Sequence, residues 1–391
     1  MNFLGKFFLG LGRLFTKVGN KLTQTRSIGK TTDVLFTGEK FPLGVFIDAP
    51  KTGIYQIKMW LPSIEAIGVN FFVICSRSEL AAEIQKISNR PVMVVKPGEV
   101  NRLAHVPGLK TWIYVNNARP NSDFVRFPQF THIQLMHGDS EKSASYTPVN
   151  GMYTKLFVAG QAGIDRYERN GVLVHKAKFV KIGRPQLASM RVGIDQEQFP
   201  TLLICPTWGG SAEDNVYSSL KLTPLLVHAA IEAGVRVIFR PHPYSLRNQS
   251  DLTVIHEVYQ ALKSDNEANQ RGHLFGNASM EMSESDAINQ STAMISDISG
   301  IVSDWLFSLK PYLLVSMDYP AEEFSSRYPV AKGGLVVDEF DEATIKSFIA
   351  KLLGEDKLLD ERIHMRDYYF EGANDQDLTK RFVDAVKETL K

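Results

Sequence analysis

The stretch Ser291–Asp318, STAMISDISGIVSDWLFSLKPYLLVSMD, places a helical run between two strand-like runs. The first strand is expected at Thr292–Ser296. The helix is expected from about Ser299 to Leu309, because apolar residues recur there at helical spacing, and Pro311 ends it. A strand that opens into a helix and returns to a second strand is typical of a parallel α/β sheet.

The turn between the first strand and the helix has the composition of a phosphate site. Asp297 and Ser299 are natural N-cap residues, and Gly300 lets a ligand approach the backbone closely. The start of a helix offers unpaired N–H groups and the positive end of its dipole. The same turn also fits an ordinary capped helix, so the other motifs of the chain must decide between the two interpretations.

Length and composition favour a globular protein of two domains. The chain has 391 residues, which is long for one core, and its 22% charged and 44% hydrophobic residues are ordinary for soluble domains. A net charge of +1 gives no indication of a nucleic-acid partner. Cys75 and Cys205 each end an apolar run and are expected to be buried thiols. No cluster has the spacing of a metal site, so the sequence implies neither a metal nor another cofactor.

Residues 1–30 differ from the rest of the chain in charge. They contain six basic residues and no acidic one, so residues 31–391 carry a net charge of −5. Nine apolar residues of segment 1–26 fall on one helical face: Phe3, Leu4, Phe7, Phe8, Leu11, Leu14, Phe15, Val18 and Leu22. This pattern predicts an amphipathic helix in a membrane interface, on a cytoplasmic protein at the inner face of the cell membrane. The alternative is a helix that packs on the protein's own body.

Strands and helices alternate from Lys30 onward. Strands are expected at Gly44–Asp48, Phe71–Cys75, Pro91–Val95, Thr111–Val115, His132–Met136, Leu156–Ala159, Phe179–Ile182, Leu202–Cys205, Arg236–Arg240, His273–Phe275 and Gly334–Val337. Helices are expected at about Tyr55–Ile67, Leu80–Lys86, Ala162–Asn170, Thr223–Ala233, Asp251–Leu262, Glu342–Leu353 and Ala373–Leu390. This order predicts an α/β fold of two Rossmann-like domains that face a cleft.

The expected domains are residues 31–190 and 191–391, after the N-terminal helix of residues 1–30. The linker is placed within Gly183–Pro200, which lacks clear periodicity. The final helix is expected to cross back to the first domain. In such sheets, ligands bind beyond the carboxyl ends of the strands, so the loops after strands should carry the chemistry.

One such loop begins with His137-Gly138 and contains Lys142. A histidine directly after a strand can act as a general base near neutral pH, or it can simply hydrogen-bond its loop. A second loop is Arg240-Pro241-His242-Pro243, in which two prolines fix the backbone around one imidazole. This rigid pair of charged and polar groups suits a diphosphate, although a stiff turn would look the same.

Two further features complete the set. Thr207 lies in Pro206-Thr207-Trp208-Gly209-Gly210, where a hydroxyl and backbone amides could hold a phosphate oxygen. Asp304 lies on the helix that follows Ser299, where it could accept a bond from a polyol or ribose hydroxyl or cover the helix surface.

Taken together, these motifs resemble the CDP-glycerol glycerophosphotransferase family of teichoic acid synthesis, which has a GT-B-like fold. The resemblance covers roughly residues 134–339 and rests on His137-Gly138 with Lys142, Gly183-Arg184-Pro185-Gln186, Pro206-Thr207-Trp208, Arg240-Pro241-His242-Pro243, and Asp297-Ile298-Ser299-Gly300 with Asp304. The chain departs from the family at Gln186 and Gly209, where the family has arginine, and at Gly300, where it has serine.

The resemblance implies transfer of a polyol phosphate from a CDP-activated donor to a hydroxyl of a lipid-linked acceptor, with release of CMP. It implies His137 as the base and His242 as a second catalytic residue. Gly138 and Lys142 would lie on the acceptor side. The donor phosphates would be held by Thr207, Arg240, Asp297, Ser299, Gly300 and Asp304. The alternatives are a GT-B glycosyltransferase that uses a nucleotide sugar and a membrane-bound binding protein with a decayed site.

Overall fold

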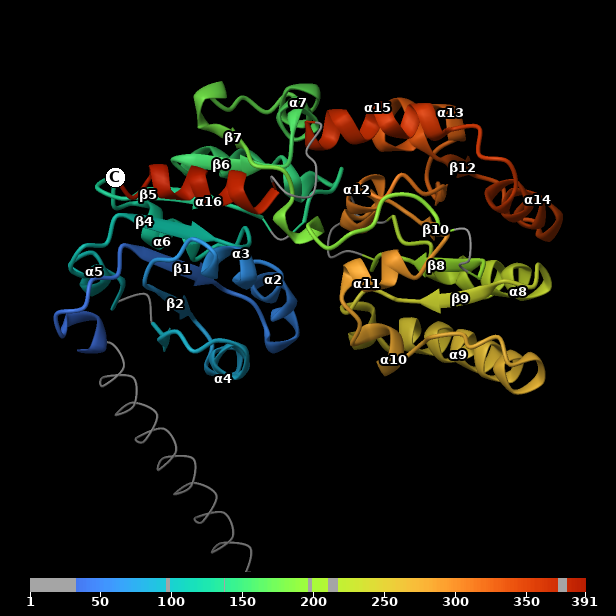
Figure 1. Cartoon of the computed structure of the whole chain (residues 1–391), viewed down its shortest axis with the longest axis horizontal. Coiled ribbons are helices and arrows are strands. Elements are labelled where there is room, and N and C mark those ends of the chain that lie inside the picture. Colours follow the sequence, from blue (N-terminus) through green and yellow to red (C-terminus); the bar gives the residue numbers. More distant parts are fainter. Residues whose placement is uncertain (1–32, 96–98, 137, 196–198, 210–216, 372–377) are drawn as a thin grey trace, which may run out of the picture. The chain divides into compact units, whose positions relative to one another are not determined.

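Two parallel β-sheets form the framework of the computed structural model, which describes residues 33–95, 99–136, 138–195, 199–209, 217–371 and 378–391 (Figure 1). The first sheet has the strand order β3-β2-β1-β4-β5-β6-β7, and the second has the order β12-β11-β10-β8-β9. Every pair of strands with a known register is parallel. Both orders are those of doubly wound α/β sheets.

The strands are β1 Leu43–Ile47, β2 Phe71–Cys75, β3 Val92–Val94, β4 Thr111–Tyr114, β5 Thr131–Gln134, β6 Lys155–Val158, β7 Phe179–Lys181, β8 Thr201–Cys205, β9 Arg236–Phe239, β10 Ala293–Ser296, β11 Tyr312–Val315 and β12 Leu335–Val337. The α-helices are α2 Tyr55–Lys58, α3 Leu61–Glu65, α4 Ser78–Ile87, α5 Val100–Leu103, α6 Asn121–Val125, α7 Gln161–Arg169, α8 Thr223–Glu232, α9 Gln249–Asn269, α10 Asn277–Met280, α11 Glu284–Asn289, α12 Gly300–Leu306, α13 Ala321–Arg327, α14 Glu342–Leu353, α15 Leu359–Phe370 and α16 Leu378–Glu388.

Alternate residues of the second sheet enter two different cores. Leu202, Ile204 and their neighbours pack against α8, α9 and α14. Leu203, Cys205 and Met294 pack on the other face against α11, α12 and α15. A parallel sheet covered on both faces needs apolar residues at consecutive positions, and this explains runs such as TLLIC in β8.

The chain separates into two compact units. The first comprises residues 1–135, 152–154 and 386–391, and the second comprises residues 136–151 and 155–385. In the first unit, the Lys110 ammonium donates to the carbonyl of Leu390, 2.7 Å away. The expected domain boundaries at residues 30 and 190 stay predictions. The expected N-terminal helix lies outside the described residues, and among the residues that are described no helix is long and apolar enough to span a membrane.

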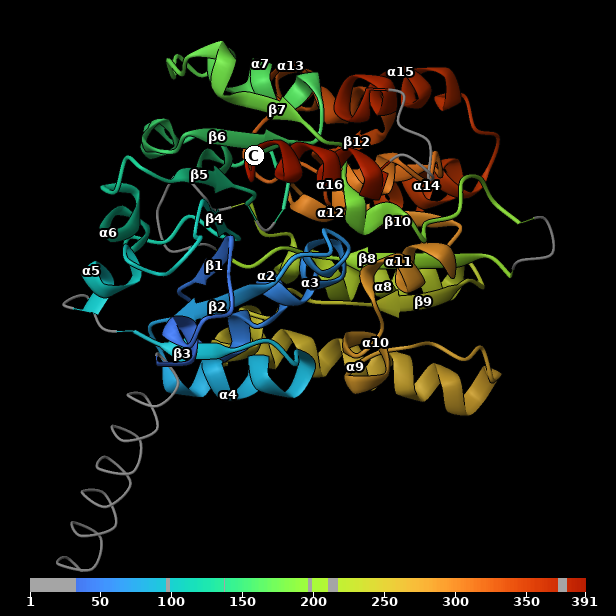
Figure 2. The same cartoon turned by 60° about the vertical axis from the view of Figure 1, so that its left-hand side comes forward.

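Several elements differ from the sequence-based expectation. The helix expected at Tyr55–Ile67 consists of two short helices, α2 and α3. The strand expected at His273–Phe275 is an isolated bridge from Leu274 to Ile238. Helix α15 was not predicted; it lies beside α7 in both views (Figure 2).

Candidate functional site

The order of the second sheet locates a candidate ligand site. In this sheet β8 is flanked by β9 on one side and by β10 on the other, so consecutive crossovers leave β8 in opposite directions. Ligands of open α/β sheets bind at such a switch point, outside the carboxyl ends of the two central strands. The loop that begins at Pro206 follows β8, and the turn from Asp297 to Gly300 follows β10.

Asp297 ties these two loops together. Its buried carboxylate accepts hydrogen bonds from the amide of Thr207 at 3.0 Å and from the amide and hydroxyl of Ser219, both at 2.8 Å. Burial raises the pKa of this carboxyl, and the nearby Lys142 ammonium and the bonds from Ser219 and Thr207 oppose that rise. The expectation that Asp297 caps the following helix is therefore wrong, because its oxygens are used by the β8 loop.

Ser299 is the N-cap residue of α12, but its side chain makes no capping hydrogen bond. Its hydroxyl lies 3.3 Å from the hydroxyl of Ser296. Helix α12 ends at Leu306 instead of the expected Leu309, because the chain turns there and Leu309 takes a positive φ of 59°.

Gly300 lies against the loop that follows β5. A Cβ atom at Gly300 would be 3.9 Å from the Cα atom of Gly138 and 4.0 Å from the amide nitrogen of Asp139. These are ordinary contact distances, so two motifs that lie more than 150 residues apart in the sequence are neighbours within the second unit.

Lys142 extends from the same loop to the β8 loop. Its Nζ donates to Oγ1 of Thr207 at a distance of 2.7 Å. Burial lowers the pKa of this half-buried ammonium, and the charge of Asp297 partly restores it. The structure thus places Lys142 beside Thr207, a residue expected to bind the donor, although Lys142 itself was expected on the acceptor side.

His242 and Arg240 are both engaged by the protein. The Nδ1 atom of His242 accepts from the amide of Tyr244 at 3.1 Å, and its ring stacks on Trp208 with the ring centroids 6.1 Å apart. A neutral imidazole in this arrangement carries its proton on Nε2. Arg240 donates through Nη1 to the carbonyls of Ser279 and Met282, the latter at 3.0 Å.

Asp304 forms a buried ion pair that the sequence did not reveal. Nε and Nη2 of Arg184 donate to its two carboxylate oxygens at 2.9 and 2.6 Å. Burial, together with the nearby Asp304, raises the pKa of Glu284 to about 8. Asp304 therefore holds Arg184 in place, and its expected bond from a polyol or ribose hydroxyl stays a prediction. Arg184 lies three residues after β7, in the motif Gly183-Arg184-Pro185-Gln186, and this motif is a signal that could have pointed to it.

Gln186, His137 and the possibility of a metal site remain to be described. The side-chain amide of Gln186 is buried, and neither its nitrogen nor its oxygen has a hydrogen-bond partner in the described part of the chain. His137 lies outside the described residues. No group of three or more histidine, cysteine, aspartate or glutamate side chains among the described residues could hold a metal ion.

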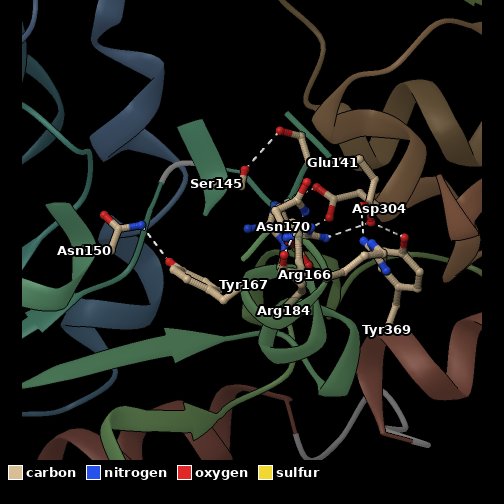
Figure 3. A network of polar contacts seen from close by, with 12 residues as sticks. Glu141, Ser145, Asn150, Arg166, Tyr167, Asn170, Arg184, Asp304 and Tyr369 are labelled. Atoms are coloured by element: carbon tan, nitrogen blue, oxygen red, sulfur yellow. Dashed lines mark hydrogen bonds and ion pairs between the residues drawn. The ribbon is translucent and has the colours of Figure 1, made fainter. Parts of the chain in front are cut away.

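A second polar cluster, which sequence reasoning missed, surrounds Arg166 of α7 (Figure 3). Arg166 is 2% exposed and donates to Asp139 and to Glu141. Glu141 also accepts from Arg169 and from the hydroxyl of Tyr369 in α15. We call these five residues the Arg166 cluster. Two of them, Asp139 and Glu141, lie in the loop that carries Lys142, just before that residue.

Comparison with known proteins gives a structural likeness without a sequence relative. No protein-family model matches the chain, and no curated protein matches it. The wall teichoic acid polymerase TagF matches 97% of this chain and 97% of its own chain, with a TM-score of 0.56 and 12% identity. A structure of its histidine-to-asparagine variant soaked with CDPG matches with a TM-score of 0.55 and 11% identity, covering 100% of this chain and 98% of its own.

Other solved structures share this architecture. A UDP-N-acetylglucosamine 2-epimerase from Listeria monocytogenes, whose activity is given as provisional, matches 90% of this chain and 97% of its own, with a TM-score of 0.56 and 10% identity. MurG from Acinetobacter baumannii matches 89% of this chain and 100% of its own, with a TM-score of 0.51 and 10% identity. Two parallel sheets and these neighbours confirm the expected α/β, GT-B-like fold. At such low identity the likeness shows the fold alone.

Proposed function

We propose that this protein transfers a polyol phosphate, such as glycerol phosphate, from a CDP-linked donor to a hydroxyl of a lipid-linked acceptor in the synthesis of teichoic acid or a related cell-surface polymer. One observation carries the proposal. The loops that contain Gly138 and Lys142, Thr207, and Asp297 to Gly300 meet within the second unit, at the switch point of its sheet. These are the loops in which the sequence resembles polyol-phosphate transferases.

The reaction requires one bond to form and one to break. The acceptor oxygen attacks the β-phosphorus of the donor and forms a phosphodiester with the polyol phosphate. The bond from that phosphorus to the oxygen of CMP breaks, and CMP leaves with the electron pair. The proton of the acceptor hydroxyl passes to His137, which acts as the general base.

Negative charge grows on the phosphate oxygens and on CMP during this transfer, so the site must supply positive charge and hydrogen-bond donors. Lys142 supplies an ammonium, which is held 2.7 Å from the Thr207 hydroxyl. Ser299 offers a hydroxyl that does not cap α12. His242 contributes through Nε2 and Arg240 through its charge, since Nη1 of Arg240 already donates to two carbonyls. We assign Lys142 to the donor, where it compensates for the absence of arginine at Gln186 and Gly209.

The likeness to TagF supports this proposal over the whole chain, because 97% of each chain is matched. One of the TagF structures is that of a histidine-to-asparagine variant soaked with CDPG. We further propose that the protein acts at the inner face of the cell membrane, held there by residues 1–26, where a lipid-linked acceptor would be accessible.

A panel of donors tests the proposal. Full-length protein is incubated with CDP-glycerol, CDP-ribitol or UDP-sugars, together with a lipid-linked acceptor, and released CMP, UMP or UDP is measured. We expect CMP release that depends on the acceptor, and loss of most turnover in His137→Ala, since a general base contributes about 10²–10⁴-fold. UDP release from a sugar donor would favour a glycosyltransferase. Binding of CDP compounds without product would favour a binding protein.

A further inference from the structure

The loop from Gly138 to Asn150 is attached to the rest of the second unit by charged side chains that do not touch the β8 loop. Arg166 donates to Asp139 through Nη1 and to Glu141 through Nη2, the latter at 3.1 Å. Arg169 donates to the other oxygen of Glu141 at 2.7 Å. Only β6 separates the loop from α7 in the sequence, so the contacts of Arg166 and Arg169 with the loop are local.

Tyr369 adds a contact from a distant part of the chain. Its hydroxyl donates to Glu141 from α15, 228 residues away in the sequence, and the tyrosine is fully buried. Figure 3 shows Glu141, Arg166 and Tyr369 drawn together in one group. Burial alone would raise the pKa of Glu141, but the two arginines and the Tyr369 hydroxyl lower it overall. Glu141 is therefore an ionised carboxylate that accepts hydrogen bonds from Arg166, Arg169 and Tyr369.

The backbone around Tyr369 is fixed by packing. Gly160 precedes α7, and a Cβ atom at this position would collide with the carbonyl oxygen and carbon of Tyr369. A glycine is needed here because α15 approaches the start of α7 so closely. The ring of Phe370, the next residue, packs edge-on against Phe307, which follows α12. The last turn of α15 thus packs against the start of α7 and against Phe307, and this packing fixes the position from which the Tyr369 hydroxyl donates to Glu141.

Burying this many charges costs free energy, and the cost is recovered only when each charge keeps its partners. A hydrophobic cluster of similar size would stabilise the fold as well or better. What the ionic cluster adds is a defined position for the loop, since hydrogen bonds to a carboxylate are directional. The residue that benefits is Lys142, which follows Glu141 directly and whose Nζ must reach Thr207 across the switch point.

We propose that Tyr369 and Arg166 are positioning residues that hold Lys142 in its donor-binding place through Glu141. The identity of the ligand rests on the proposed function, whereas the coupling from α15 to Lys142 does not. In this arrangement, α15 has a role in ligand binding that acts through Glu141.

The test compares two adjacent tyrosines. Tyr369→Phe removes the bond to Glu141 and keeps the ring, whereas Tyr368→Phe removes a matched bond of 3.0 Å to Asp165 on the same helix pair. In hydrogen–deuterium exchange of the ligand-free full-length protein, we expect the amides of residues 138–150 to lose protection about tenfold in Tyr369→Phe and to stay unchanged in Tyr368→Phe. Equal loss, or no loss, in both variants would overturn the positioning role.

A second measurement links the cluster to Lys142. With CDP-glycerol as the donor, we expect Tyr369→Phe to raise the KM for donor about tenfold with little change in kcat, because Lys142 would no longer be held in place beside Thr207 and its bond to the charged donor would weaken. Lys142→Met should have a larger effect, and adding Tyr369→Phe to it should change the KM no further. An additional tenfold loss in the double variant would show that Tyr369 acts by another route. If wild-type protein turns over no CDP donor, the proposed function fails, and the exchange experiment still decides the coupling.

Discussion

Lys142 shows how much of the candidate site depends on single residues. Its ammonium is the cation placed directly on a hydroxyl of the β8 loop, and burial already lowers its pKa. A half-buried ammonium that has lost part of its hydration is a favourable partner for an anionic ligand, because the ligand's charge would replace that hydration. Under the proposed function, Gln186 and Gly209 supply no positive charge, so Lys142 would carry more of the charge neutralisation of the donor.

We therefore expect Lys142→Met to weaken binding of a CDP-linked donor by about 10–100-fold, the effect of losing one or two hydrogen bonds to a charged group. Thr207→Val should have a smaller effect of about tenfold, since it removes one neutral hydroxyl and keeps the side-chain volume. Isothermal titration calorimetry with CDP-glycerol measures both. The control is Lys221→Met, which removes an exposed lysine of the same unit. Equal affinities in all three variants would exclude Lys142 from the donor site.

The buried carboxyl of Glu284 should make the free energy of unfolding depend on pH. Its folded pKa is raised to about 8, first by burial and then by the carboxylate of Asp304, whereas its ordinary value is 4.5. Between these values the folded protein binds a proton that the unfolded chain has released, so the free energy of unfolding falls as pH rises from about 4.5 to 8. Glu284→Gln keeps the shape and removes this titration.

We expect Glu284→Gln to raise the free energy of unfolding at pH 8.5 by several kcal/mol, because the pKa rises from 4.5 to about 8 and each unit of pKa shift corresponds to about 1.4 kcal/mol. At pH 5 the two proteins should differ less. Urea denaturation at both pH values measures the difference. Glu281→Gln is the control, because Glu281 is exposed on the neighbouring turn. A stabilisation that is the same at pH 5 and at pH 8.5 would contradict the prediction.

The residue contacts could be predicted from the sequence only in part. The motifs after strands selected Thr207, Lys142 and the turn at Gly300, whose loops lie together in the structure, while their roles in binding stay predictions. The ion pairs and hydrogen bonds around these loops could not be predicted. Arg184 meets Asp304 across 120 residues, and the Tyr369 hydroxyl meets Glu141 across 228 residues. No local pattern marks such pairs, since each partner alone looks like an ordinary polar residue of a helix or turn.

Among the elements, strands were predicted better than helices. The buried parallel strands are continuous apolar runs bounded by polar turns, and β2 was predicted at its observed limits. Helix limits depend on contacts made elsewhere in the fold. Helix α9 extends to Asn269 because its end is fixed by tertiary contacts, such as that of the Asn266 side chain with His273. The sequence from His273 to Phe275 is strand-like, but the structure has an isolated bridge there, between Leu274 and Ile238 of β9.

The pairing of β1 with β4 provides a test at the element scale. Gly44 lies opposite Trp112 in the register of these strands, and a Cβ atom at Gly44 would be 2.6 Å from the indole ring. The ring is buried and packs edge-on against Phe72 and Phe124, so it has little room to move. An added methyl group therefore produces overpacking, although alanine is otherwise tolerated in a strand.

We expect Gly44→Ala to lower the free energy of unfolding by about 1–3 kcal/mol, the usual cost of an overpacked core. Thermal denaturation followed by circular dichroism measures the change. The matched control is Gly138→Ala, where a Cβ atom would meet no atom within 4 Å. If Gly44→Ala melts at the wild-type temperature, the strand pair must relax more easily than its packing indicates. Restoration of stability by the double variant Gly44→Ala with Trp112→Leu would support the steric explanation.

At the scale of the whole molecule, the charge is distributed unevenly along the chain. Residues 1–30 contain six basic side chains and no acidic one, whereas residues 31–391 carry a net charge of −5. An anionic surface would thus attract the N-terminal segment and repel the remainder of the protein. Such a distribution favours a protein that is tethered to a membrane by one end, while its folded units stay in solution.

We expect residues 1–30 to be necessary and sufficient for binding to anionic vesicles. Each basic residue near such a surface contributes about 1 kcal/mol, and the apolar face of segment 1–26 adds to this when it enters the interface. Full-length protein should sediment with phosphatidylglycerol vesicles, and protein that lacks residues 1–30 should stay in the supernatant.

Replacing Lys17, Lys21 and Arg26 by glutamine should weaken binding at least tenfold and reduce its dependence on salt, because fewer charges are screened. Replacing Phe7 and Phe8 by serine should weaken binding equally at low and at high salt, since burial of apolar surface is not screened. If the shortened protein sediments as well as the full-length chain, the membrane-binding surface lies elsewhere, and the basic segment has another partner.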